Sequence, residues 1–155
     1  MEVRALTGDQ WRLKRDLRLA ALRDSPHAFV STHAREARRS EADWRSWPPG
    51  GAFFAAFDGP SAPVGIVGAW VAAAAPGTTH LIGMWVAPAV RGRGIAGLLA
   101  EAVVGWARSC GHDTVELELA CGNTAALNAY LRCGFVPADR HPFTSGGTVL
   151  VRPVA

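Results

Sequence analysis

The chain of 155 residues is 49% hydrophobic and 19% charged, a length and composition that suit one globular domain and exclude a disordered or fibrous protein. Its longest apolar run, residues 64–75, is too short for a transmembrane helix of about 20 residues. No leader-like segment opens the sequence, so we expect a cytoplasmic protein with no membrane partner. The net charge of +3 comes entirely from residues 1–50, which hold 10 Lys and Arg against 7 Asp and Glu.

Basic residues gather in two groups near the N-terminus and raise the question of a nucleic-acid partner. Acidic residues are interleaved with them and the excess of positive charge is small, which favours a solvated helix surface. We therefore expect no nucleic-acid partner. The two groups are Arg12, Lys14, Arg15 and Arg18, and then Arg35, Arg38 and Arg39.

The three cysteines, Cys110, Cys121 and Cys133, show no C-x-x-C spacing. Their odd number and their separation argue against a disulfide framework and against a structural zinc site. We expect them to be small buried hydrophobic side chains, and we expect no metal.

The first 86 residues predict helices followed by three consecutive strands. An apolar stripe at helical spacing, ended by Ser25-Pro26, predicts a helix over 9–24. A second, more polar helix is expected within 32–47, before the breakers that start at Pro48. Alternating and β-branched runs predict a short strand at 3–6 and strands at 53–57, 64–71 and 80–86. The stripe consists of Trp11, Leu17, Ala20, Ala21 and Leu22.

The second half predicts helices and strands in alternation. Apolar residues recur at helical spacing from Ile95 to Trp106, up to Cys110-Gly111. Residues 113–120 alternate as a strand does, with Val115, Leu117 and Leu119 on one face and Glu116 and Glu118 on the other. Asn123 can cap a helix that Gly134 ends. The segments 135–140 and 148–152 predict a closing hairpin.

The stretch at 90–97, VRGRGIAG, has the G-x-G-x-x-G spacing of a dinucleotide-binding loop in Gly92, Gly94 and Gly97. Glu116 and Glu118 lie close to the distance at which such a fold places its ribose-binding acid. Four residues, however, separate the end of the preceding strand from Gly92, and three strands come first without intervening helices. Both features argue against a nicotinamide-binding fold.

The same stretch combines a strand end, a basic glycine-rich turn and a helix N-terminus. Exposed N–H groups, the helix dipole and the missing Cβ atoms together favour an anion such as a phosphate. From these residues alone, an ordinary strand-to-helix connection with an exposed arginine remains an equal alternative.

Two blocks of the sequence, in the same order, resemble the GNAT superfamily of N-acetyltransferases. VAPAVRGRGIAGLL is similar to that family's acetyl-CoA-binding signature, R/Q-x-x-G-x-G/A, through Arg91, Gly94 and Ala96. The close resemblance covers 80–136. The later block, LELACGNTAALNAYLRCGF, has the family's residues in the expected order: Asn123, Ala126, Tyr130, Gly134 and Phe135.

The resemblance implies an α/β (α+β) fold. Its central sheet would be mixed and mostly antiparallel, splayed between strands 80–86 and 113–120, and flanked by about four helices. A single acetyltransferase domain would span 1–155, with an acetyl-CoA-binding core at 80–136 and variable substrate-side helices in 1–50. Relatives are often dimers, so a homodimer is left open.

The resemblance also implies acetyl-CoA as co-substrate and assigns residues to it. The pyrophosphate would lie on the backbone amides of the glycine loop, and the pantetheine arm would pair like an extra strand with the end of strand 80–86. The cofactor-binding residues expected on this basis are Met84, Trp85, Val86, Arg91, Gly92, Arg93, Gly94, Ile95, Ala96, Gly97, Asn123 and Tyr130.

Acetyl transfer to an amine requires a neutral amine, a stabilised oxyanion and a proton for the departing thiolate. Glu118 occupies the position of a catalytic glutamate in the bacterial ribosomal-protein N-terminal acetyltransferases, and it is the first candidate for the base. His80 is the rival, because relatives carry a glutamate near this point and imidazole titrates near neutral pH. Tyr130, the only tyrosine, has the family's position of proton donor. A backbone N–H of 84–86 would meet the oxyanion.

The acceptor site is indicated less directly. Its entrance would be formed by the helices within 9–47 and the turn at 140–147, with Phe29, Glu36, Trp44 and Glu118 as the expected substrate-binding residues. Trp44 and Trp47 could form an apolar wall. Glu36, Glu41 or Asp43 could bind a cationic amine. Further candidates are His33, His141 and Phe143.

We expect the acceptor to be the primary amine of a small molecule, such as an antibiotic or a metabolite. The basic first half argues against a polyamine. A protein or peptide N-terminus is the alternative acceptor. A non-catalytic acyl-CoA-binding sensor is the alternative from another class, and it would need neither Glu118 nor Tyr130.

Overall fold

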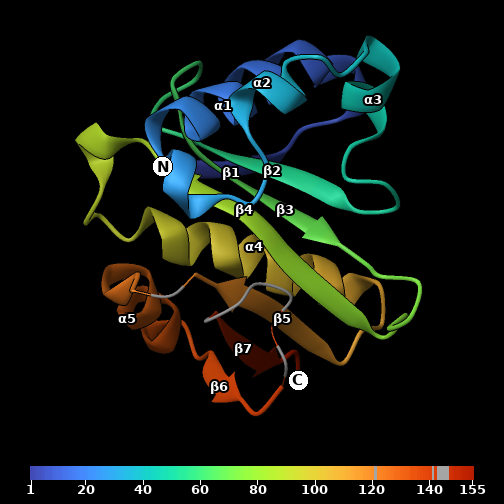
Figure 1. Ribbon diagram of the computed structural model, residues 1–155, viewed down its shortest axis with the longest axis vertical. Coiled ribbons are helices and arrows are strands. Elements are labelled where there is room, and N and C mark those ends of the chain that lie inside the picture. The colour runs from blue at the N-terminus through green and yellow to red at the C-terminus, as the bar shows by residue number, and fades with distance from the viewer. Residues whose placement is uncertain (121, 141, 143–146) are drawn as a thin grey trace.

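A mixed sheet runs through the computed structural model, which describes residues 1–120, 122–140, 142 and 147–155 (Figure 1). The described strands pair in the order β1-β2-β3-β4-β5-β7-β6. Each neighbouring pair is antiparallel except β4 and β5, which are parallel. The expected α/β fold with a mostly antiparallel sheet is thereby confirmed. The strands are β1 (Glu2–Ala5), β2 (Ala52–Phe57), β3 (Pro63–Trp70), β4 (Thr78–Val86), β5 (Thr114–Leu119), β6 (Val136–Ala138) and β7 (Thr148–Pro153).

Helices flank this sheet on both sides. In Figure 1, α1, α2 and α3 lie together at the top of the view, α4 crosses its middle, and α5 lies near β6 and β7 at the bottom. Within the described residues, no helix has the length and hydropathy needed to cross a membrane. The α-helices are α1 (Trp11–Asp24), α2 (His33–Glu36), α3 (Glu41–Ser46), α4 (Ile95–Ser109) and α5 (Thr124–Arg132).

The polar helix expected within 32–47 is in fact two short helices. Thr32 opens α2 by accepting a hydrogen bond from the Arg35 N–H at 3.2 Å. Ser40 opens α3 with a reciprocal capping box to Asp43, whose carboxylate accepts the Ser40 N–H at 3.1 Å. Two capped helix starts so close together leave no room for one continuous helix.

The sheet buries a hydrophobic layer on each face. On one face α4 packs Leu99 and Val103 into a cluster with β3, β4 and β5. On the other face α1 packs Leu17 and Ala21 against β2 and β3. The expected alternation of 113–120 is confirmed, because the three apolar residues of β5 lie in the α4 cluster and the two glutamates between them do not.

The apolar stripe expected for α1 is partly wrong. Ala20 is exposed, whereas Lys14 and Arg18 are buried. The expectation of a solvated basic surface therefore fails for these two side chains. Lys14 Nζ lies 3.4 Å from the Arg45 carbonyl oxygen, and burial lowers its pKa. Long basic side chains can bury their stems in this way while finding polar partners for their heads.

The expectation of buried cysteines is also wrong where the structure tests it. Cys110 is exposed and Cys133 is half-buried. Both follow the apolar core positions of a helix at its C-terminal end, where the chain returns to the surface. Cys121 lies outside the described residues.

The parallel strands β4 and β5 separate after three residue pairs. Thr78, Thr79 and His80 pair with Thr114, Val115 and Glu116. Beyond them β4 bulges, with a register shift against β3 and a left-handed φ of +62° at Gly83. Residues 82–86 of β4 therefore have no strand partner on the β5 side among the described residues, and the expected splay is confirmed.

Candidate functional site

The glycine-rich stretch connects β4 to α4. A 3-10 turn, Pro88–Val90, follows β4, and the chain then passes through Gly92 to Gly94, which precedes α4. Gly92 and Gly94 have φ values of +81° and +80°, a region in which other residues are strained. A Cβ atom at either position would meet nothing within 4 Å. The space in front of the loop is therefore open to a ligand.

The N-terminus of α4 adjoins this open space. The helix has 15 residues, and Gly94 provides no side-chain cap. The N–H groups of the first turn thus lack a side-chain acceptor at the cap, and the positive end of the helix dipole adds to their field. The arrangement has the chemistry of a phosphate-binding site.

Loop and helix line a cleft of about 730 Å³ at the place where β4 and β5 part. Met84, Trp85 and Val86 form the β4 side of this cleft, and α5 lines it from the opposite side through residues that include Ala129 and Cys133. Gly97 on α4 faces the residue that follows α5, because a Cβ built on it would lie 3.5 Å from Cys133 Sγ.

Asn123 lines the cleft at the start of α5. Its Oδ1 accepts a hydrogen bond from the Ala126 N–H at 3.3 Å. The expected helix cap is therefore confirmed. A second donor group, the side-chain amide nitrogen, belongs to the same residue, so capping and contact with a ligand are compatible.

Asp24, at the end of α1, was not singled out by the sequence. Its Oδ2 accepts hydrogen bonds from Trp85 Nε1 at 3.0 Å and from Arg91 Nη2 at 2.8 Å. The bond from Trp85, with those from Ser25 and Arg91, holds the pKa of Asp24 below its usual range. Arg91 Nε also donates to the Val86 carbonyl at 2.9 Å. One carboxylate thus joins α1, β4 and the glycine loop.

These contacts change how the Arg91 side chain is understood. Arg91, which the family signature assigns to the cofactor, lines the cleft, and two of its three guanidinium nitrogens, Nε and Nη2, have partners within the protein. Its side chain positions the loop against the end of β4. Arg93, also expected at the cofactor, is exposed.

Tyr130 lies on α5 and is 7% exposed, within the hydrophobic cluster of α4. Its ring makes an edge-to-face contact with Phe135 at 5.7 Å between centroids. Burial, with a smaller effect of Cys133, raises the pKa of the phenol. A phenol is protonated at neutral pH even at its ordinary pKa, so Tyr130 is in the state that a proton donor requires, and burial makes it a weaker acid.

The two candidates for the base lie on the sheet face opposite α4. Glu118 is half-buried on β5, two residues beyond Glu116. His80 Nδ1 lies 3.7 Å from Glu116 Oε2, and the His80 ring packs on Trp70 at 5.5 Å. Glu116 Oε1 also accepts from Arg140 Nη1 at 2.5 Å. Glu116 thus connects the rival base to Arg140, a contact that sequence analysis did not predict.

The expected acceptor residues lie at different depths. Phe29 lines the cleft. Glu36 and Trp44 are both fully buried and do not line it, and Trp47 packs edge-to-face on Trp44 at 6.4 Å. His33 lies on α2 with Nε2 3.1 Å from Arg23 Nη2. Glu41 and Asp43 are exposed on α3. His141 and Phe143 lie outside the described residues.

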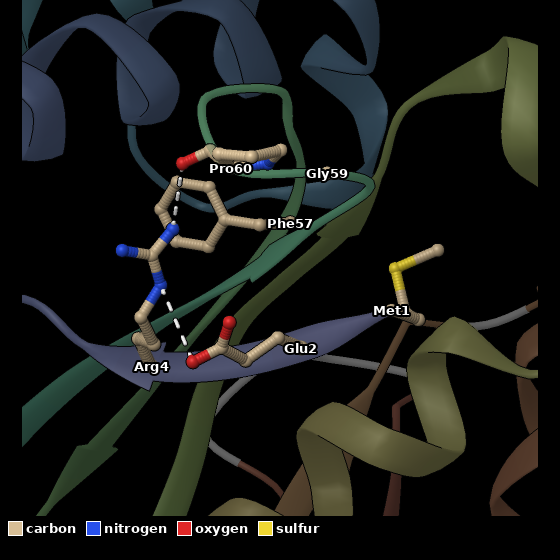
Figure 2. A pocket seen from close by; sticks show the side chains of 6 residues that line it. All are labelled: Met1, Glu2, Arg4, Phe57, Gly59 and Pro60. Carbon is tan, nitrogen blue, oxygen red and sulfur yellow. Dashed lines mark hydrogen bonds and ion pairs between the residues drawn. The ribbon is translucent and has the colours of Figure 1, made fainter.

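A second hollow, of about 430 Å³, lies at the β1 edge of the sheet, three strands away from β4 (Figure 2). Arg4 dominates it. Its guanidinium stacks 3.8 Å from the Phe57 ring centroid, and Nη2 donates to the Pro60 carbonyl at 3.1 Å. Glu2 Oε1 lies 3.8 Å from Arg4 Nε. A ring, a carbonyl oxygen and an opposite charge from within the chain therefore surround the Arg4 guanidinium.

No group of three or more metal-ligating side chains occurs in the part of the chain that the structure describes.

Comparison with known families gives one match over most of the chain. The model of the acetyltransferase (GNAT) family matches residues 17–135. No curated protein sequence matches at a significant level.

Solved structures share the fold over nearly the whole length. An acetyltransferase of the GNAT family from Staphylococcus aureus Mu50 is 15% identical, with a TM-score of 0.76 and 99% of each chain covered. A phosphinothricin acetyltransferase from Sinorhizobium meliloti, in complex with acetyl-CoA, is 19% identical, with a TM-score of 0.72 and coverage of 98% of this chain and 87% of that one. A Salmonella typhimurium protein solved with its cofactor acetyl-CoA is 19% identical, with a TM-score of 0.67 and coverage of 100% and 94%.

Proposed function

This chain belongs to the acetyltransferase (GNAT) family, and we propose that it transfers the acetyl group of acetyl-CoA to the primary amine of a small molecule. One observation carries the proposal. The loop through Gly92 and Gly94 leaves open space in front of a helix N-terminus, at the point where β4 and β5 part.

The residues of the cleft fit acetyl-CoA. The N–H groups of the loop and of the first turn of α4 would hold its pyrophosphate. Residues 84–86 of β4, which lack a strand partner on the β5 side among the described residues, would take up the pantetheine arm. The Val86 carbonyl is already bonded to Arg91, so the other backbone groups of this edge would make the contacts. Acetyl-CoA supplies the activated thioester.

Three groups of this chain then meet the chemical demands. Glu118 takes the proton of the acceptor amine, with His80 as the rival, and such positioned bases contribute about 10²- to 10⁴-fold in rate. A backbone N–H of residues 84–86 donates to the carbonyl oxygen as it gains charge. Tyr130, whose phenol is protonated at neutral pH, gives its proton to the departing thiolate.

The test is thiol release from acetyl-CoA with a panel of small amines and peptide N-termini. Tyr130→Phe should lower turnover by about 100-fold or more while acetyl-CoA binding is retained. Glu118→Gln and His80→Asn, compared side by side, identify the base by which of them lowers turnover. Glu2→Gln, at the exposed start of β1, is the matched control and should leave turnover unchanged.

The outcomes separate the candidate functions. Release with peptide N-termini alone would assign a protein acceptor. Binding of acetyl-CoA with no release to any amine would favour an acyl-CoA sensor. Full turnover in both Tyr130→Phe and Glu118→Gln would overturn the assignment of the acid and of the first-choice base.

A further inference from the structure

Arg18 of α1 carries a positive charge into the interior of the protein. The residue is 6% exposed. Its Nε and Nη2 donate to the two carboxylate oxygens of Glu36, each at 2.9 Å. The third nitrogen, Nη1, is buried and has no hydrogen-bond partner among the described residues. An unpaired buried donor costs about 1–3 kcal/mol, and more when it is charged, so Nη1 calls for an acceptor.

Nη1 of Arg18 lies against the bulge of β4, beside residues that line the cleft, although Arg18 itself does not line it. A Cβ built on Gly83 would lie 3.0 Å from it. Gly83 forms the bulge of β4 and immediately precedes Met84, which lines the cleft. The guanidinium also stacks on Phe29, 4.7 Å from the ring centroid, and Phe29 lines the cleft as well. Arg18 therefore lies directly behind two cleft-lining residues.

The charges around Arg18 do not balance. Glu36 is fully buried and serves two guanidinium groups, because Arg39 Nη1 lies 3.1 Å from its Oε1. Burial alone would raise the pKa of Glu36, but hydrogen bonds from Arg18 and the charges of both arginines lower it on balance, so the carboxylate is ionised at neutral pH. Two positive groups thus share one negative group.

Aromatic rings do not remove this excess of charge. Arg18 lies 5.3 Å from the Trp47 ring centroid, and Arg39 lies 5.3 Å from that of Trp44. Such stacking stabilises the face of a guanidinium. Its N–H edge still needs an acceptor, and an anion would satisfy the edge and neutralise the surplus charge together.

We propose that the acceptor amine carries a carboxylate, which binds Nη1 of Arg18 at the Gly83 end of the cleft. The inference rests on the proposed function and names the chemical class of its acceptor. The carboxylate would make a charge-assisted hydrogen bond on the edge of Arg18 that Glu36 leaves unused. A polyamine would place a further positive charge beside two arginines and is disfavoured.

Matched acceptors test this on the wild-type protein. Thiol release is measured with ω-amino acids from glycine to 6-aminohexanoate, each beside the alkylamine of the same chain length, and with apolar α-amino acids beside their primary amides. A hydrogen bond to a charged group is worth about 1.5–3 kcal/mol. At least one acid should therefore exceed its neutral partner in kcat/KM by about 10- to 100-fold.

Variants then assign the preference to Arg18. Arg18→Lys keeps the charge but loses the paired donors, and the double variant Arg18→Gln/Glu36→Gln removes both charges of the pair. In each, the ratio of kcat/KM for acid and neutral partner should fall toward 1. Arg15→Gln is the matched control, since Arg15 lies on the same helix and pairs with the adjacent Asp16 at 2.9 Å; its ratio should equal the wild-type ratio. Thermal unfolding and acetyl-CoA affinity check the fold of each variant.

The possible outcomes distinguish failure of the inference from failure of the proposed function. Neutral amines that match the acids, or a ratio that Arg18 variants leave unchanged, would overturn the inference while the transferase stands. No release with any amine, from folded protein that binds acetyl-CoA, would overturn the proposed function and the inference with it. If the variants fail to fold, the wild-type comparison of acids with their neutral partners decides alone.

Discussion

The two ends of the cleft are built by different means. At one end the backbone of the glycine loop and the start of α4 surround open space, and no side chain caps the helix. Behind the other end Arg18, Glu36 and Arg39, none of which lines the cleft, come together from α1, from α2 and from the residues after it, and are packed among aromatic rings. The first end is a local backbone conformation. The second depends on tertiary packing of charged side chains, and such packing can change from one relative to another while the loop is kept.

The largest expected effect is a loss of stability when Glu36, in the buried cluster of charges, is changed. Glu36→Gln would leave Arg18 and Arg39 without a counter-charge, and breaking a buried ion pair costs about 3–5 kcal/mol. Because the folded state lowers the pKa of Glu36, its stabilisation is complete above the unfolded value of about 4.3 and is lost as the pH falls through the folded value. Urea unfolding at pH 7 and at successively lower pH should show the two proteins converging in acid.

Glu41→Gln is the control for that measurement. Glu41 pairs with Arg45 one helical turn away, on an exposed surface, where such pairs contribute about 0.3–0.5 kcal/mol. If the free energy of unfolding falls no more in Glu36→Gln than in Glu41→Gln, the buried cluster does not stabilise the fold. The difference described between the two ends would then be wrong.

The next largest effect is expected on acetyl-CoA affinity when the glycine loop is changed. Gly94→Val places a β-branched residue at a φ of +80° and a side chain in the open space before α4. We expect acetyl-CoA affinity to fall about 100-fold, equivalent to about 2.7 kcal/mol, as measured by calorimetry. Gly111→Val is the matched control, since Gly111 has a φ of +73°, open space around its Cβ position and a place at the other end of the same helix.

Both glycine variants should lose about 1–2 kcal/mol of stability through backbone strain. Only Gly94→Val should lose affinity. Equal affinities in the two variants would mean that the ligand does not reach the N-terminus of α4.

Loss of the Asp24 contacts, which join α1 to β4 and the glycine loop, is expected to have an intermediate effect. Asp24→Asn removes the charge that attracts Arg91 and weakens the bond from Trp85, which loosens the glycine loop. Acetyl-CoA affinity should fall about 5- to 10-fold. Asp16→Asn, exposed on α1 beside Arg15, serves as the comparison, and an equal loss in both variants would refute a positioning role for Asp24.

The smallest expected effect is on the rate at which a reagent modifies the Cys133 thiol. Burial, with Glu101 nearby, raises the pKa of this thiol, so iodoacetamide should modify it more slowly than the exposed Cys110. Since Cys133 lines the cleft, saturating acetyl-CoA should slow its modification further, by about 3- to 10-fold, while Cys110 reacts as before. Mass spectrometry of the separated peptides measures both rates. Unchanged labelling of Cys133 would place the ligand elsewhere.

Sequence reasoning succeeded where the signal is local. Alternation placed Val115, Leu117 and Leu119 in the core, and the glycine spacing located the loop before α4, because both patterns follow from backbone geometry over a few residues. The splay of β4 from β5 was expected from the family resemblance and was confirmed.

Local patterns do not reveal contacts between distant parts of the chain. Asp24 meets Trp85 and Arg91 more than sixty residues later, and no periodicity links such positions. Charge usually indicates exposure, so sequence reasoning predicts a surface position for Arg18. Arg18 is nevertheless buried, because it forms an ion pair with Glu36 on a separate short helix. Tertiary ion pairing overrode the local expectation at this position.

The most direct test of the central claim is calorimetric titration of the wild-type protein with acetyl-CoA, with NADH titrated beside it. We predict saturable binding of acetyl-CoA, at one site per chain, and no heat from NADH. Failure of folded protein to bind acetyl-CoA would contradict the assignment of the glycine loop and the transferase function that rests on it.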